Sequence, residues 1–132
     1  MKSKIILAAR ILLGLIFLVF GLNFFLHFIP QPPMPAAAGA FAGAMFATGY
    51  LFTLVKVIEV TCGALLLAGR FVPLALALLA PIVINIVCFH AFLAPQGMPL
   101  PLVVLALEVF LAWSFRGAYR PMLAARAAPS DA

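Results

Sequence analysis

Four long apolar segments follow one another along this chain, and they limit its fold more than any other feature. They cover about residues 6–29, 50–68, 71–93 and 101–115. An α-helix rises about 1.5 Å per residue, so such segments suit a hydrocarbon core roughly 30 Å thick. Of the 132 residues, 67% are hydrophobic and 8% are charged, whereas soluble domains carry about a quarter charged residues. The sequence predicts an all-α membrane protein, a four-transmembrane-helix bundle formed by a single domain over residues 1–132.

Prolines and glycines predict where the helices end. Four prolines between residues 30 and 35 terminate the first span, because proline lacks an amide donor and restricts the residue before it. No proline follows until after Arg70, and a continuous helix over that stretch would be about 50 Å long, which exceeds the membrane core. We therefore expect a break near Thr48 and Gly49, with an extra short helix between spans one and two.

The basic residues predict the topology. Apart from Lys56 inside the second span, they lie before or early in the first span, at Arg70 between spans two and three, and after the fourth span, whereas the other two connections carry no charge. The positive-inside rule then places both termini in the cytoplasm. We place Trp113 and Tyr119 at the membrane interface, and we expect a disordered tail over about residues 121–132. The net charge of +5 does not indicate nucleic-acid binding, because no basic run is interleaved with aromatic residues in a polar context.

Small residues predict close helix packing. Gly14 and Gly21 share a stripe of the first span with Arg10, and such a stripe lets a second helix approach closely. Cys62 and Cys88, placed on neighbouring antiparallel spans, would differ in depth by about 15 Å. A disulfide needs Cα atoms within about 7 Å, so we expect two unbridged, buried cysteines.

Polar side chains inside the apolar segments are the candidates for function. A charged side chain costs about 2.5 to 3.5 kcal/mol at the centre of a membrane, so each should face protein, water or another charge. Candidates for a ligand or proton site are Arg10, Lys56, Glu59, Asn85 and Glu108.

Two readings of the carboxylates stay open. Glu59 and Glu108 either compensate Arg10 and Lys56 and fix the helix register, or they bind protons or a polar headgroup. Lys56 either pairs with Glu59 at i, i+3 or reaches the outer interface, which leaves Glu59 for Arg10. The sequence does not decide between these pairings.

Metal binding and catalysis have little support in the sequence. His27 and His90 are weak metal candidates, because they are the only two histidines and no other clear ligand accompanies them, so we predict no metal site. No CxxC motif, nucleotide-binding loop or nucleophile–base pair occurs. Whether the chain takes part in an enzyme therefore stays open, and no catalytic residue is predicted.

Two short motifs resemble the DoxX-like family of small bacterial membrane proteins. The first is Arg10-Ile-Leu-Leu-Gly14, followed by Gly21 and Asn23. The second is Lys56-Val-Ile-Glu59, followed by Gly63, a leucine run and Gly69-Arg70-Phe71. The resemblance extends from about Arg10 to Arg116.

This resemblance implies a four-helix bundle in the bacterial inner membrane. Some relatives are subunits or accessories of membrane oxidoreductases, including thiosulfate:quinone oxidoreductase, and many have no assigned activity. Arg10 and Glu59 are the polar residues that the resemblance carries over, whereas the histidines, Cys62 and Glu108 are not.

Three functional hypotheses follow. The first is a subunit or accessory of a quinone-linked oxidoreductase system, with quinone as its cofactor and the lipid bilayer, another membrane or redox protein, or a second copy of the chain as its partner. The second is a proton-coupled exporter that uses Glu59. The third is a structural membrane assembly protein in which the charges only set helix register.

Overall fold

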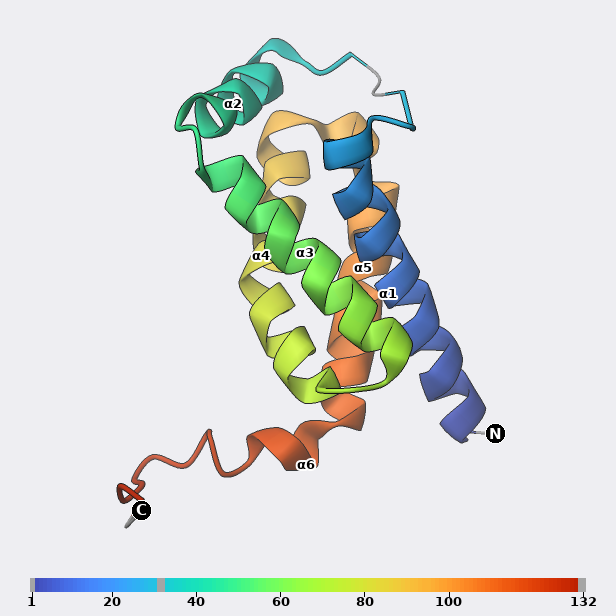
Figure 1. The fold of residues 1–132 in the computed structure, drawn as a ribbon, viewed down its shortest axis with the longest axis vertical. Helices are drawn as coiled ribbons and strands as arrows, with labels where there is room; N and C mark the ends of the chain where they lie inside the picture. The colour runs from blue at the N-terminus through green and yellow to red at the C-terminus, as the bar shows by residue number, and fades with distance from the viewer. Residues whose placement is uncertain (1, 31–32, 131–132) are drawn as a thin grey trace.

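The computed structural model describes residues 2–30 and 33–130, and this part of the chain is helical without strands (Figure 1). The all-α prediction is confirmed. In chain order the elements are α1 (Lys2–Leu26), α2 (Ala36–Ala47), α3 (Leu51–Ala68), α4 (Val72–Leu93), the 3-10 turn η1 (Pro95–Gly97), α5 (Pro99–Ser114) and α6 (Arg116–Tyr119).

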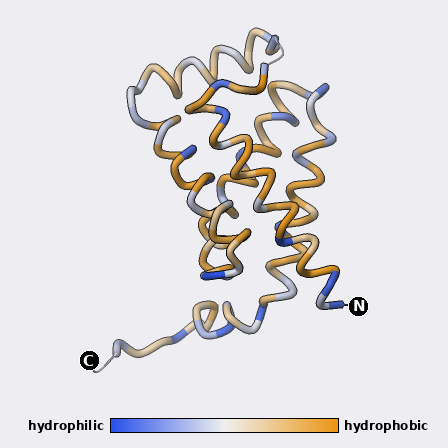
Figure 2. Tube along the Cα trace, turned by 45° about the vertical axis from the view of Figure 1, so that its right-hand side comes forward, coloured by the Kyte–Doolittle hydropathy of each residue, from blue (hydrophilic) through white to orange (hydrophobic). Residues whose placement is uncertain are grey.

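Four of these helices form a bundle. In Figure 1, α1, α3, α4 and α5 run along its long axis, both termini lie at one end, and α2 lies across the other end. Three helices, α1, α3 and α4, are long and apolar enough to cross a membrane, and α5 is a shorter apolar helix of 16 residues. Figure 2 shows apolar residues along the full length of the bundle, with hydrophilic positions gathered near its ends and at a few points inside. The protein is therefore a multi-pass membrane protein.

The first helix ends at Leu26, three residues before the expected boundary, and a buried side chain holds the chain beyond it. The Oδ1 atom of Asn23 accepts a hydrogen bond from the Ile29 amide at 2.6 Å, and its Nδ2 atom donates to the Ile29 carbonyl at 3.3 Å. His27 adopts a positive φ of 53° where the helix stops. Pro32, one of the prolines expected to end this helix, lies outside the described residues.

The predicted break between α2 and α3 is confirmed. Gly49 has a φ of 82°, a left-handed conformation that glycine adopts without steric cost. The hydroxyl of Thr48 donates to the Met45 carbonyl at 2.7 Å and accepts from the Leu51 amide at 3.0 Å. One hydroxyl thus satisfies a carbonyl at the end of α2 and an amide at the start of α3.

The closest packing in the bundle joins α1 to α3 through glycines, as the stripe in the first span predicted. A Cβ atom on Gly63 would lie 2.7 Å from the Leu18 amide nitrogen and 2.9 Å from the Gly14 carbonyl oxygen. A Cβ atom on Gly21 would lie 2.7 Å from Val60. The two backbones meet here directly, so the register of α1 against α3 is fixed. Around this seam the core contains the fully buried side chains Leu13, Leu66, Leu76, Leu79, Leu111, Val83 and Cys62.

The two cysteines have different environments. Cys62 is buried in α3, whereas Cys88 is exposed on α4, and both are free thiols. The expectation that both are buried is therefore wrong for Cys88. A membrane helix is apolar all round, so hydrophobicity alone does not tell its buried face from its lipid-facing one.

Candidate functional site

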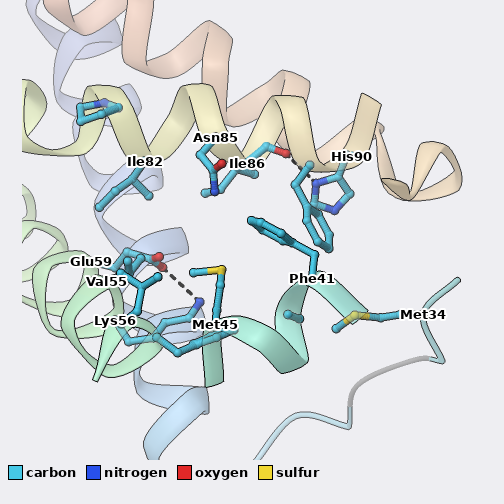
Figure 3. A pocket seen from close by; sticks show the side chains of 15 residues that line it. Met34, Phe41, Met45, Val55, Lys56, Glu59, Ile82, Asn85, Ile86 and His90 are labelled. Carbon is cyan, nitrogen blue, oxygen red and sulfur yellow. Dashed lines mark hydrogen bonds and ion pairs between the residues drawn. The ribbon is translucent and has the colours of Figure 1, made fainter. Parts of the chain in front are cut away.

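A cavity of about 590 Å³ lies between α2, α3 and α4, at the end of the bundle that α2 covers (Figure 3). Its walls are mainly apolar. It is lined by Met34, Phe41, Ala42 and Met45 from α2 and the segment before it, by Leu51, Phe52, Val55, Lys56 and Glu59 from α3, and by Pro81, Ile82, Asn85, Ile86, Phe89 and His90 from α4. This size and composition are typical of a pocket for a small organic molecule.

An ion pair lies at the α3 wall of the cavity. The Nζ atom of Lys56 is 3.3 Å from Oε1 of Glu59, one turn along the same helix. The Lys56 side chain is 20% exposed and the Glu59 side chain 5%, so the pair is largely removed from solvent. The ammonium also lies 5.5 Å from the centre of the Phe52 ring, within range of a cation–π interaction. Of the two pairings that the sequence left open, the structure contains the one within α3.

The opposite wall carries two polar side chains from α4. Figure 3 shows the Asn85 amide pointing into the cavity, between the ion pair and His90. The Nδ1 atom of His90 lies 2.9 Å from the Ile86 carbonyl oxygen. A carbonyl oxygen only accepts, so Nδ1 carries the proton, and in the neutral ring Nε2 is then a free acceptor. The cavity lining thus contains the Lys56–Glu59 ion pair, the Asn85 amide and the His90 ring within apolar walls.

The two histidines line different cavities. His27 lines a smaller cavity of about 230 Å³, together with Asn23, Phe24 and Lys56, whereas His90 lines the larger one. Among the residues that the structure describes, no group of three or more His, Cys, Asp or Glu side chains is placed to hold a metal ion. Lys56 borders both cavities.

Arg10 lies away from the cavity and binds the backbone of α3. Its guanidinium donates hydrogen bonds to the carbonyl oxygens of Leu66 and, at 3.4 Å, of Leu67. It also packs over Gly69, where a Cβ atom would lie 2.6 Å from Nη1. A cation at the C-terminal end of a helix meets unsatisfied carbonyls and the negative end of the helix dipole. Arg10 therefore ties α1 to the end of α3 and is no counter-ion for Glu59.

Glu108 is buried in α5 and lines neither cavity. Its Oε1 atom is the one buried side-chain oxygen or nitrogen in the described part of the chain that lacks a hydrogen-bond partner. Of the candidates from the sequence, the structure brings together Lys56, Glu59, Asn85 and the weak metal candidate His90, and it places Arg10 and Glu108 elsewhere.

Sequence reasoning missed the contribution of α2 to this site. Phe41, Met45 and Phe46 are the large side chains in a tract otherwise made of small residues, and Phe41 and Met45 stand at i, i+4, on one face of a helix. That spacing was the available signal that one face of α2 covers something apolar. Phe41 packs against Phe89 of α4, with ring centres 5.9 Å apart.

Comparison with known proteins gives one match. A model of the DoxX family matches residues 5–92, a range that contains Arg10 and all four polar residues of the cavity, but not Glu108. No curated protein and no solved structure matches the chain.

Proposed function

The chain belongs to the DoxX family, and we propose that it binds a quinone in the cavity between α2, α3 and α4, as a subunit or accessory of a membrane oxidoreductase system. The observation that carries this proposal is the composition of the cavity. A membrane quinone has an apolar ring and tail and two oxygens that accept hydrogen bonds as carbonyls and donate them as hydroxyls. Apolar walls with a few polar groups on facing helices match such a molecule.

Each polar group has a role in this proposal. The Asn85 amide and the Lys56 ammonium are the donors that would hold ring carbonyls, and the Nε2 atom of His90 is the acceptor that would hold a ring hydroxyl. Glu59 orients the Lys56 side chain through their 3.3 Å contact. The quinone supplies reversible two-electron chemistry when bound, and the protein supplies its binding and orientation.

The placement in the membrane is also part of the proposal. Seven of the eight basic residues lie near the end of the bundle that carries both termini, and the exception is Lys56. This distribution supports four crossings by α1, α3, α4 and α5 in a bacterial inner membrane, with both termini cytoplasmic. The cavity then lies in the outer half of the bilayer, where a quinone can enter from the lipid.

A direct test is the quinone content of the protein purified in mild detergent and extracted with organic solvent. We expect bound quinone to copurify with the wild type and to be strongly reduced in Asn85→Leu. The control Gly43→Ala should retain it, because a Cβ atom there has nothing within 4 Å. The absence of quinone from wild type and control alike, after supplementation during purification, would contradict the proposed function.

A further inference from the structure

A surface at the end of the bundle that carries both termini combines exposed arginines with exposed apolar side chains. The apolar members are Phe71, Trp113, Met122 and Leu123, which are 67% to 75% exposed. The basic members are Arg70, Arg116 and Arg120, all exposed. We call these seven residues the basic collar.

The collar is held in place by specific contacts. The hydroxyl of Tyr119 donates a hydrogen bond to the Pro73 carbonyl at 2.6 Å, which ties α6 to the first turn of α4. Burial raises the pKa of Tyr119, so this hydroxyl keeps its proton. The guanidinium of Arg116 donates to the Trp113 carbonyl at 2.9 Å and lies 4.5 Å from the centre of the Trp113 ring. These contacts fix α6 and Trp113 at the bundle end. The Leu123 amide donates to the Tyr119 and Arg120 carbonyls at 3.0 and 3.2 Å, which holds the turn after α6 against that helix, and the chain beyond this turn leads away to the side (Figure 1).

Phe71 is held in a strained conformation. Its φ is 54°, in the left-handed region that residues other than glycine rarely adopt. Its side chain is 68% exposed, so packing inside the protein does not compensate for the cost of this conformation. Phe71 and Arg70 thus present an aromatic ring and a guanidinium side by side on the surface. In a lipid the ring could contact an acyl chain while the guanidinium binds the neighbouring phosphate.

The exposed charge of the described residues has one sign. Glu59 and Glu108 are buried, and the third acidic residue of the sequence, Asp131, lies outside the described residues. Six basic side chains are exposed near this end, namely Lys2, Lys4, Arg70, Arg116, Arg120 and Arg126. A cationic surface with apolar side chains between the cations is complementary to anionic lipid.

From these observations we propose that the basic collar is a binding surface for anionic phospholipid headgroups. The arginines bind phosphate, which they can contact with two parallel hydrogen bonds, while Phe71, Trp113, Met122 and Leu123 insert among the acyl chains. The inference rests on the membrane placement described above and does not depend on the quinone.

Trp113 gives a direct test, because it is the only tryptophan of the chain. The 132-residue protein is placed in nanodiscs of phosphatidylcholine alone or of phosphatidylcholine with phosphatidylglycerol. Binding of phosphatidylglycerol is measured in competition with phosphatidylcholine. Each arginine near an anionic surface contributes roughly fivefold in affinity. We therefore expect a preference for phosphatidylglycerol that falls with salt, accompanied by a blue shift of Trp113 emission.

The decisive variant is Arg70→Gln combined with Arg120→Gln, which leaves the contact of Arg116 with Trp113 in place. The preference should fall by more than tenfold, and it should return in the variant with lysine at both positions. Lys2→Gln with Lys4→Gln is the control with the same change in charge, and it should lose much less of the preference, because these lysines lie outside the basic collar. An equal loss in the test and control variants would mean that only the net charge of the protein matters, and this would overturn the proposal. Equal binding of both lipids by the wild type would also overturn it.

Discussion

The ammonium of Lys56 lies 3.3 Å from the carboxylate of Glu59 on the wall of an apolar cavity. Both charges are shielded from water, so each depends on the other for compensation. This pair connects the segment Lys56-Val-Ile-Glu59 to a three-dimensional site, because the helix that carries it faces Asn85 and His90 across the cavity. The pair and its neighbours lead to the following predictions.

Removing one member of the pair should destabilise the protein more than removing both. Lys56→Met leaves a buried carboxylate without its partner, and breaking a buried pair costs about 3 to 5 kcal/mol. Because Lys56 is 20% exposed, we expect a value at the lower end of that range. The double variant Lys56→Met with Glu59→Met should come close to the wild type. Unfolding of the purified protein in SDS, followed by circular dichroism, measures both effects. Additive losses would mean that the two charges do not stabilise each other.

The glycine seam between α1 and α3 should not tolerate a methyl group. In Gly63→Ala the new Cβ atom would lie 2.7 Å from the Leu18 amide nitrogen, and backbone atoms cannot rotate away. We expect a loss of about 1 to 3 kcal/mol, as for other overpacked sites. Gly43→Ala provides the matched control, because its Cβ atom meets open space and alanine favours a helix by about 0.5 to 1 kcal/mol. Equal stability of the two variants in the SDS assay would argue against direct contact between these backbones.

Arg10 should contribute to stability and not to quinone binding. Arg10→Met removes the hydrogen bonds to the carbonyls of Leu66 and Leu67, and bonds of this kind to a charged group contribute about 1.5 to 3 kcal/mol. The same SDS assay should show this loss, while the quinone content per folded protein stays at the wild-type level. Lys4→Met, at an exposed position of the same helix, is the control. A folded Arg10→Met protein without quinone would contradict this prediction and indicate that Arg10 contributes to quinone binding.

The sequence predicted the helices well because their limits depend on local chemistry. Length alone required a break before α3, and Gly49 supplied a residue that accepts a positive φ. The glycine stripe of α1 predicted that another helix packs closely against α1. It did not predict that Gly63 of α3 lies at this contact, because the stripe belongs to α1 alone and carries no information about its partner. The four crossings and the cytoplasmic termini stay predictions.

The site was harder to predict because its partners are distant in sequence. The acceptors of Arg10 are backbone carbonyls, which every residue carries, so residue types could not reveal them. The cavity exists because α2 lies across α3 and α4. The alanine-rich sequence of α2 contains few large side chains from which this position could be predicted. Asn85, Lys56 and Glu59 were recognised as polar groups in apolar helices, but their convergence on one cavity depends on how the helices pack.

The most direct test of the central claim is photolabelling with an azido-quinone in proteoliposomes, followed by mass spectrometry of the labelled peptides. We predict attachment to residues that line the cavity, within 34–59 and 81–90, and its loss when unmodified quinone is added in excess. Asn85→Leu should weaken binding roughly tenfold, the effect of one lost hydrogen bond of about 1.4 kcal/mol. Label spread over the lipid-facing sides of α1 and α5, and not displaced by unmodified quinone, would contradict quinone binding in this cavity.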